Sequence, residues 1–344
     1  MKLPNLNSPL ILAISFLSFS SAQQEFKATT LITSSTSKFG KAIEGASVNA
    51  NGEIFATNFN SEQFSIGRIT PSQSPFHTSS SRKSFYNGIR FLPLTGSQIG
   101  QGIKSVALLA NVNENQITKI VEENDGKIQQ GKFCEDETLF LPNDLSYSYK
   151  SDRIYISAQN FTADTVKGDG GLWLCNGKNG NVIKLQAFGR TNGIDLSPDE
   201  KILYISEAFN KDSIVISNKI WKFNINQRTG KVFNQKLFVD FEKLDGTQNI
   251  DIDGMRTDND GNLYVTRNGG SQVVVFSPRG KILSRINLNS IKNPTNLEFG
   301  GKDGKTLFIV GACKDNDKKG CVDTIQNSGP GRTFIALKSP NGKY

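Results

Sequence analysis

A single phrase recurs along this chain of 344 residues and constrains its fold more than any other feature. Each copy begins with a small polar or acidic residue, usually followed by glycine, and continues through an apolar strand, a turn and a second strand. Turn dipeptides such as Asn51-Gly52 and Asp260-Gly261 indicate that each copy is a β-hairpin. Successive copies start 43, 56, 49, 61 and 43 residues apart. The starts are Glu44, Asn87 (a weaker copy), Asn143, Asn192, Asp253 and Asn296.

Further strand-like segments lie between the copies, such as residues 171–175 and 220–224, and no stretch shows convincing helical periodicity. Each unit therefore holds about four strands, and four-stranded units repeated around an axis are the blades of a β-propeller. A sandwich would need fewer strands, and the rungs of a β-helix are much shorter. We predict an all-β fold, a six-bladed β-propeller with four antiparallel strands per blade around a central channel, formed as one domain by residues 23–344.

The amino terminus has the pattern of a secretory signal peptide. Lys2 is followed by an apolar stretch over residues 9–19, and Ser20-Ser21-Ala22 offers small residues for cleavage. The apolar run is too short, and too broken by serines, for a membrane anchor. We therefore expect residues 1–22 to be removed and the mature protein to be secreted, extracellular and without a membrane span.

Cysteine usage agrees with an oxidising compartment. Cys313 and Cys321 enclose a short polar loop that suits a disulfide, which leaves Cys134 and Cys175 as the second pair. The sequence contains no CxxC motif, so redox catalysis and zinc ribbons are not expected. Asn160 begins the sequon Asn-Phe-Thr and is a candidate glycosylation site.

Charge and histidine content exclude several classes of function. The only histidine is His77, so a metal site that needs two or three imidazoles cannot form. His77 lies in a Ser-, Thr- and Pro-rich stretch, residues 69–83, which we predict to be a surface loop and not part of a catalytic triad. The net charge is +8, but basic and acidic residues alternate, which predicts a solvated basic surface and no nucleic-acid partner. We expect a monomer.

The residues that open the copies form a candidate metal site. If each phrase is the innermost strand of its blade, the six opening side chains encircle the mouth of the channel. An Asn or Asp before Gly is by itself an ordinary turn residue. As a set, however, six oxygen-bearing side chains without a lysine or arginine need a bound cation, because carboxylates in a partly dry cavity repel one another. Oxygen ligands favour Ca²⁺, with Mg²⁺, Mn²⁺ or Zn²⁺ as alternatives.

The phrases also resemble those of the gluconolactonase and regucalcin (senescence marker protein) family of six-bladed propellers, which includes diisopropylfluorophosphatase. The resemblance is carried by Glu44-Gly45, Asn143-Asp144, Asn192-Gly193-Ile194-Asp195 and Asp253-Gly254-Met255. It implies that Glu44, Asn143, Asn192 and Asp253 bind one divalent metal, usually calcium. It also implies hydrolysis of lactones or, in some members, of organophosphate esters. Leu141 stands where regucalcin-like members have a sugar-binding arginine, which favours a less polar lactone or ester.

These observations lead to one main hypothesis and two alternatives. The main hypothesis is a secreted calcium-dependent lactonase that acts on a small-molecule cyclic ester, with Asp253 as the general base or as a nucleophile. Asn87 and Asn296 would orient the substrate beside the metal. The alternatives are a non-catalytic binding module with a structural calcium, and an organophosphate or aryl ester hydrolase that uses the same site.

Overall fold

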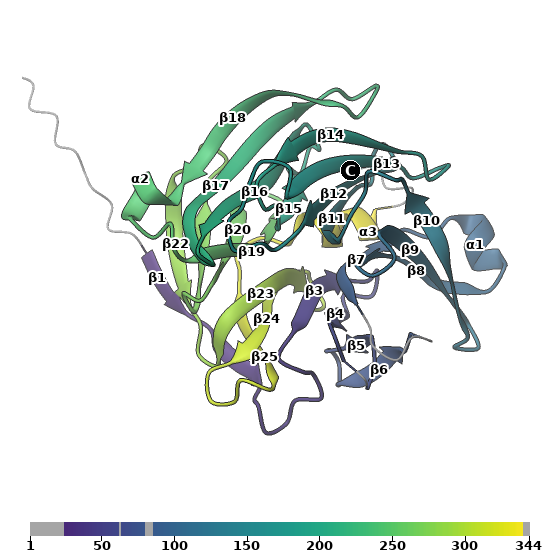
Figure 1. Cartoon of the computed structure of the whole chain (residues 1–344). Coiled ribbons are helices and arrows are strands. Elements are labelled where there is room, and N and C mark those ends of the chain that lie inside the picture. Colours follow the sequence, from purple (N-terminus) through teal and green to yellow (C-terminus); the bar gives the residue numbers. More distant parts are fainter. Residues whose placement is uncertain (1–23, 62, 80–84, 340–344) are drawn as a thin grey trace, which may run out of the picture.

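The computed structural model describes residues 24–61, 63–79 and 85–339, which form six β-sheets around a central axis (Figure 1). Five of the sheets have four strands and one has five. Neighbouring strands within a sheet are antiparallel, apart from the parallel fifth strand. The prediction of a six-bladed β-propeller is confirmed. The proposed signal peptide, residues 1–22, lies outside the described residues, so it stays a prediction together with the domain limits.

The strands follow the chain order of the repeat, with one blade for each copy. They are β1 (Gln24–Lys27), β2 (Thr29–Ile32), β3 (Ile43–Val48), β4 (Ile54–Asn58), β5 (Ile66–Arg68), β6 (Ser74–His77), β7 (Tyr86–Leu92), β8 (Ile103–Asn111), β9 (Gln116–Glu123), β10 (Ile128–Glu135), β11 (Pro142–Ser148), β12 (Arg153–Gln159), β13 (Gly170–Asn176), β14 (Val182–Phe188), β15 (Ile194–Leu196), β16 (Ile202–Lys211), β17 (Ile214–Ile225), β18 (Val232–Asp240), β19 (Asp251–Thr257), β20 (Leu263–Asn268), β21 (Gln272–Phe276), β22 (Ile282–Asn287), β23 (Ile291–Gly300), β24 (Thr306–Cys313) and β25 (Gly320–Gln326). The helices are α1 (Gly96–Gly100), α2 (Phe241–Asp245) and α3 (Arg332–Lys338).

The first strand of every blade is the innermost, as the repeat predicted. Strands β3, β7, β11, β15, β19 and β23 contact one another in a closed ring around the axis. Five of the residues that open the repeats lie in these strands, and Asn192 lies two residues before β15. The ring therefore brings segments about 50 residues apart in sequence to one end of the channel.

The amino-terminal strands close the ring. Blade 6 consists of β23, β24 and β25 with β2 as its outer strand, so it joins both ends of the described chain. Strand β1 pairs in parallel with β22 and adds a fifth strand to blade 5. These pairings tie residues 24–32 to the last two blades.

Apolar side chains fill the spaces between the blades. Residues of the second strands lie there, and Phe55, Tyr155 and Tyr264 are at most 5% exposed. The Tyr155 hydroxyl donates to the carbonyl oxygen of Gly230 in the next blade at 2.9 Å. The ring of Tyr264 meets that of Phe299 in blade 6 edge to face, with 5.0 Å between centroids. This packing holds neighbouring blades together without a separate core.

Both predicted disulfides are present. Cys134 of β10 is bonded to Cys175 of β13 and so joins blade 2 to blade 3. Cys313 of β24 is bonded to Cys321 of β25, eight positions along the chain, and closes the β24–β25 hairpin of blade 6. Asp315 lies close to this second pair, but both sulfurs are already bonded to each other, so the three residues do not form a metal site.

Two local predictions were wrong. Within the stretch predicted to be a loop, Ser74–His77 forms β6, the outer strand of blade 1, where the His77 ring hydrogen bonds to Gln130 of blade 2 at 2.9 Å. The sequence shows no helical periodicity, yet α3 packs across the far end of the channel (Figure 1). Helix α3 has seven residues, too few for a helical period to show in the sequence.

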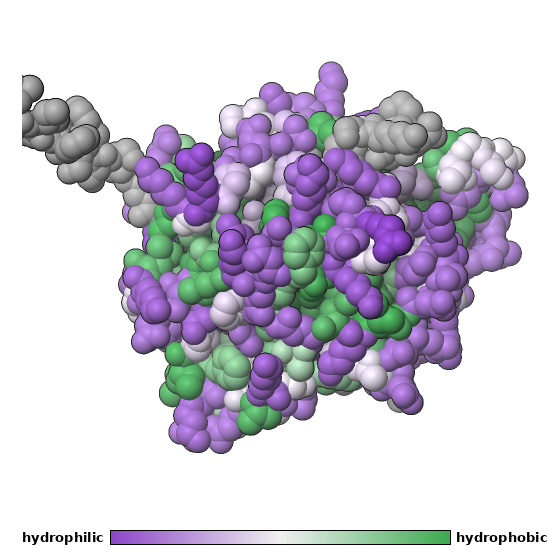
Figure 2. Space-filling view, turned by 90° about the horizontal axis from the view of Figure 1, so that it is seen from above, coloured by the Kyte–Doolittle hydropathy of each residue, from purple (hydrophilic) through white to green (hydrophobic). Residues whose placement is uncertain are grey.

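The outer surface is predominantly hydrophilic. Figure 2 shows the face that carries the outer strands β14 and β18, where apolar side chains lie among many polar ones. Among them, Ile183, Phe233 and Leu237 are each more than 40% exposed. No helix in the described part of the chain is both long enough and apolar enough to cross a membrane.

Candidate functional site

A pocket of about 550 Å³ opens at the end of the channel where the inner strands begin. Five of the six predicted ring residues line it together: Glu44, Asn87, Asn143, Asn192 and Asp253. They come from blades 1 to 5 and supply carboxylate and amide oxygens. The remaining wall is formed by Ala42, Phe59, Val112, Leu141, Pro142, Gln159, Phe161, Arg190, Asp251 and Asn268.

A β-bulge occurs next to most of these residues in the inner strands. The pairing of inner and second strands shifts register between Glu44 and Ser47, and the corresponding shift occurs in blades 2, 3 and 5. An inserted residue of this kind bends a strand and redirects its side chains. In these four blades the bulges therefore turn the opening residue of the repeat toward the mouth of the channel.

Steric contacts explain why glycine follows most of the ring residues. A Cβ added to Gly45 would lie 2.1 Å from the carbonyl oxygen of Asn87, and one added to Gly193 would lie 2.2 Å from that of Asp253. Both distances are far below any allowed contact, so a side chain would push the next blade away. Gly45 also has a φ of +50°, which favours glycine. The Xaa-Gly motif thus sets how closely the ring residues of adjacent blades approach.

The two carboxylates of the ring are electrostatically strained without a cation. The pKa of Glu44 is raised well above its usual value by burial and by repulsion from Asp253 and Asp144. Burial also raises the pKa of Asp253 to about 7, with a further contribution from Asp251. The Asn268 amide donates to Oδ2 of Asp253 at 2.8 Å, and Asn192 also hydrogen bonds to this carboxylate. Asp253 is thereby fixed in orientation.

This donor set fits a hard divalent cation. Glu44 and Asp253 supply two negative charges, and Asn143 and Asn192, each 8% exposed, supply amide oxygens at the same pocket. Calcium accepts such a mixture of carboxylate and amide oxygens in irregular geometry. A cation here would also relieve the repulsion that raises both pKa values. The residues that would hold it are Glu44, Asn143, Asn192 and Asp253.

Asn296 lies one level deeper than the other predicted ring residues. It is not among the residues that line the pocket, and its Oδ1 accepts a hydrogen bond from Arg256 at 3.0 Å. Asn296 packs against Gly254 as Asp144 packs against Gly88. Asn296 is therefore the structural equivalent of Asp144, which follows the ring residue Asn143. The residue of blade 6 that is equivalent to Asn143 is Thr295. Its predicted role in substrate binding stays a prediction.

A buried network of opposite charges closes the channel below the pocket. Arg256 contacts Asp144 and Glu298 at 3.3 Å each, and Arg90 contacts Asp144 at 3.1 Å. Farther down, Arg332 of α3 contacts Asp195 at 2.8 Å. The side chains of all these pairs are at most 2% exposed. Guanidinium groups thus fill the channel beneath the ring and leave the cation position at its mouth.

Comparison with known proteins identifies the family of the chain. The family model described as the SMP-30/Gluconolactonase/LRE-like region matches residues 98–312, more than half of the chain. The chain belongs to this family. The matched region includes Asn143, Asn192 and Asp253, whereas Glu44 and Asn87 precede it.

Relatives within the family are distant. The gluconolactonase of Zymomonas mobilis is 33% identical over 178 residues, which cover 49% of this chain and 47% of that protein. The regucalcin of Xenopus laevis is 26% identical over 216 residues, or 62% of each chain. The chain therefore spans about half to three fifths of the length of these relatives.

Solved structures of family members show the same fold. A calcium-binding regucalcin from Agrobacterium tumefaciens superimposes with a TM-score of 0.66 at 17% identity, covering 90% of this chain and 96% of that one. A gluconolactonase from Xanthomonas campestris gives a TM-score of 0.59 at 16% identity, covering 87% and 95%. At such identities the likeness establishes the propeller and not its substrate.

Several pocket residues of this gluconolactonase-family chain were missed by sequence reasoning. Arg190 and Asp251 form an ion pair at the pocket, and each stands two positions before a ring residue. Asn268, which fixes Asp253, is the last residue of β20. A search for polar residues at the ends of second strands would have found Asn268. The ion pair joins blade 4 to blade 5. The spacing of two from a ring residue could have indicated both positions, but it does not show that the two side chains pair.

Leu141, which stands where regucalcin-like members have an arginine, makes the pocket less polar. Leu141 lines it together with Phe59, Val112 and Phe161, so apolar side chains form much of the wall. Arg190 is not a free substitute for the missing arginine, because its side chain is 3% exposed and pairs with Asp251. The pocket therefore combines an oxygen-rich floor with a largely apolar wall.

Proposed function

We propose that this chain is a secreted, calcium-dependent lactonase that opens a cyclic ester by attack of water. The observation that carries the proposal is the convergence of Glu44, Asn143, Asn192 and Asp253 on one open pocket, where two carboxylates have raised pKa values. Membership of the SMP-30/Gluconolactonase/LRE-like family and relatives named gluconolactonase support the reaction class. The bound cation would supply Lewis-acid polarisation of the ester carbonyl.

Asp253 has the position and environment of a general base. Asn268 donates to its Oδ2, and Asp253 lines the pocket, where its carboxylate could contact a water molecule. Asp253 would take a proton from this water as the water oxygen bonds to the carbonyl carbon of the lactone. The ring C–O bond then breaks, and the departing alkoxide receives a proton to give a hydroxy acid. Direct attack by the Asp253 carboxylate is the alternative first step.

The shape of the wall bears on the substrate. Leu141, Phe59, Val112 and Phe161 provide apolar surface above the oxygen-rich floor. Apolar contacts of this kind bind hydrocarbon and exclude water from the reacting ester. The Asp251–Arg190 pair is the one charged group of the wall, apart from the ring itself, that could hydrogen bond to a substrate hydroxyl. We propose a lactone less polar than a sugar lactone.

Secretion is supported by two observations on the folded chain. Two disulfides join strands of the propeller, as expected for an oxidising compartment. Asn160 of the sequon is exposed, at the start of the β12–β13 loop, so a glycosyl transferase could reach it. Glycosylation of Asn160 and the monomeric state remain predictions.

Hydrolysis of a lactone panel tests the proposal. We expect the purified protein to release acid from aliphatic or aromatic lactones, to lose this activity in EDTA and to recover it when calcium is restored. The panel should also contain sugar lactones, an aryl ester and a phosphotriester. Turnover of only the phosphotriester or the aryl ester would favour the alternative hydrolase. Absence of turnover, with calcium still raising the melting temperature, would favour a binding module with a structural calcium.

Calcium affinity should depend on pH. Because the pKa of Asp253 is about 7 in the absence of a cation, protons compete with calcium for this carboxylate below neutral pH. One such group predicts an affinity about tenfold lower at pH 6 than at pH 8. The raised pKa of Glu44 acts in the same direction. Titration calorimetry at both pH values measures this change, and an affinity independent of pH would contradict the assigned ligands.

A further inference from the structure

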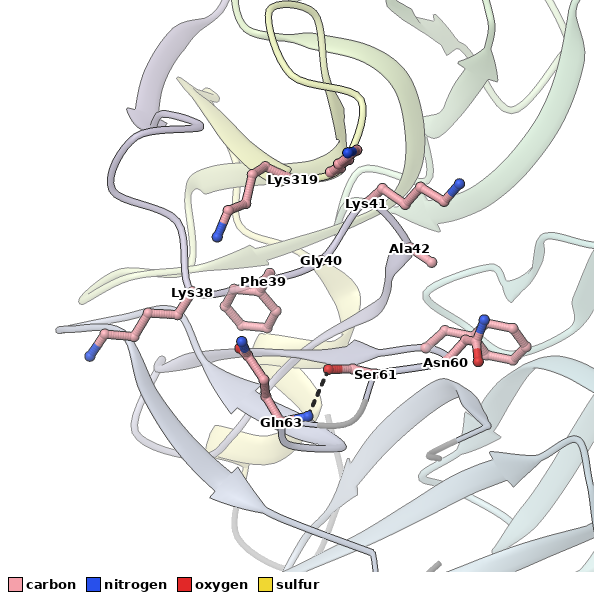
Figure 3. A pocket seen from close by; sticks show the side chains of 11 residues that line it. Lys38, Phe39, Gly40, Lys41, Ala42, Asn60, Ser61, Gln63 and Lys319 are labelled. Carbon is pink, nitrogen blue, oxygen red and sulfur yellow. Dashed lines mark hydrogen bonds between the residues drawn. The ribbon is translucent and has the colours of Figure 1, made fainter. Parts of the chain in front are cut away.

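The pocket at the channel mouth borders a second concavity on the side of blades 1 and 6. This concavity has a volume of about 470 Å³, and Ala42 and Phe59 line both spaces. Figure 3 shows Lys38, Lys41 and Lys319 in its wall, with ammonium groups that point away from one another. These charges therefore do not converge on one ligand. The side of the pocket formed by blades 3 and 4 instead presents an aromatic ring.

Phe161 is a large apolar side chain that stays exposed in the wall of the pocket. It lines the pocket and is 64% exposed. The guanidinium carbon of Arg190 lies over its ring, 4.9 Å from the ring centroid. Because Arg190 is buried, it supports the ring from within the protein, and the exposed part of the ring is open to a ligand. A single exposed apolar side chain is ordinary on a protein surface, but Phe161 lines a pocket and has a fixed support.

Arg190 is itself held by side chains from three blades. Its guanidinium donates to Oε1 of Gln159 in blade 3 at 3.2 Å and to Oδ1 of Asn210 in blade 4 at 3.3 Å. It also forms the ion pair with Asp251 in blade 5. Hydrogen bonds in three directions fix the plane of a guanidinium group. The surface on which the Phe161 ring rests is therefore fixed as well.

The loop that carries this ring, residues 160–169, is tied down at both ends. The backbone N–H of Asn160 donates to the carbonyl oxygen of Asp169 at 2.6 Å, and the Thr162 hydroxyl donates to the Asp169 carboxylate at 2.9 Å. The side-chain amide of Asn210 donates to the carbonyl oxygen of Thr162 at 3.1 Å. The residue that holds the guanidinium thus also holds the loop. An aromatic ring fixed in this way loses little freedom when a ligand binds.

We infer, on the basis of the lactonase proposed above, that Phe161 forms a subsite for an aromatic substituent of the substrate. Aromatic rings stack in offset or edge-to-face geometry, and this contact adds to the free energy of apolar burial. Phe161 and Asp253 line the same pocket, so an ester bound at Asp253 would place a substituent within reach of the Phe161 ring. The volume of about 550 Å³ accommodates a lactone together with one phenyl group. The substrate class is therefore an aryl-substituted lactone.

Binding of lactams tests the subsite independently of turnover, because the amide of a lactam resists hydrolysis. Titration calorimetry with calcium present compares a five-membered lactam that bears a phenyl group with lactams that bear a cyclohexyl or a methyl group. We expect the wild type to bind the phenyl lactam most tightly. Phe161→Ala should weaken this binding about tenfold, because it removes the stacking contact and its apolar area. The substitution keeps the sequon of Asn160, which accepts any residue except proline at its second position.

Two further variants serve as controls. Phe233→Ala removes another exposed phenylalanine, from β18 at the outer edge of blade 4, and should bind all three lactams like the wild type. Phe161→Tyr keeps an aromatic ring and should keep the preference for the phenyl lactam. Equal affinity of the wild type for the phenyl and cyclohexyl lactams, absence of phenyl lactam binding, or an equal loss in Phe233→Ala would overturn the proposal. A protein that hydrolyses no lactone, yet binds the phenyl lactam through Phe161, would retain the subsite and contradict only the lactonase.

Discussion

Replacing Asp253 by asparagine should lower lactone hydrolysis by about 10³-fold, the order of effect expected when a general base is removed. The amide keeps an oxygen that can contact the cation, but it cannot accept the proton of the attacking water or act as a nucleophile. Steady-state kinetics on the preferred lactone measure the loss, which should fall on kcat more than on KM. Asp260→Asn is the control, because Asp260 is exposed in a turn of the same blade.

The same variant should remain folded. Burial raises the pKa of Asp253 to about 7, so in metal-free protein its ionisation opposes folding, and this loss of stability develops as the pH rises from about 4 through 7. D253N removes the titrating group, and its metal-free melting temperature at pH 8 should be no lower than that of the wild type. Full activity in D253N would contradict the assigned role. Loss of activity together with unfolding would show a structural role instead.

Replacing Arg256 by methionine should destabilise the propeller by about 3–5 kcal/mol, the usual cost of leaving buried charges without their partner. Arg256 is 1% exposed and contacts both Asp144 and Glu298 at 3.3 Å. The positive charge of Arg256 partly offsets the rise that burial causes in the pKa of Glu298, so this pKa would rise further without Arg256. Urea unfolding followed by intrinsic fluorescence measures the change.

Two further variants separate charge from packing at Arg256. Arg256→Lys keeps the positive charge but not the forked donors, so it should restore part of the lost stability. Lys132→Met removes one partner of an exposed ion pair with Glu135 and should not shift the unfolding midpoint measurably. If Arg256→Met changed stability as little as Lys132→Met, the network would not be what holds the inner strands together.

The period of the repeat was sufficient to predict the blades and most of the ring. The first five copies open with a polar residue, continue with glycine or aspartate and then have a buried apolar residue, as in Asn143-Asp144-Leu145. The copy in blade 6 was aligned one residue late. Matching the buried Leu297 to Leu145 places Thr295 at the ring level and Asn296 with Asp144. In a strand, a shift of one residue moves a side chain to the other face, which is why Asn296 lies below the pocket lining while its predicted role in substrate binding stays untested.

The pocket wall was harder to predict than the ring, because the contacts that form the wall do not recur from one repeat to the next. Leu141 was visible as a departure because it stands at a fixed distance from Asn143. The burial of Arg190 against Asp251 was not visible, because the two residues are 61 positions apart and lie in different blades. Sequence spacing can locate a ring residue, but it does not show whether a charged neighbour is free or already paired.

The sequence by itself determined the number of blades, the position of the inner strands, the two disulfides and the set of residues around the channel mouth. Each of these depends on a local pattern that recurs along the chain or on a small number of cysteines. Only the tertiary structure decided the closure of blade 6 by β2 and the arginine network that fills the channel. These features join single segments that are far apart in sequence, so their energy comes from contacts that no local pattern encodes.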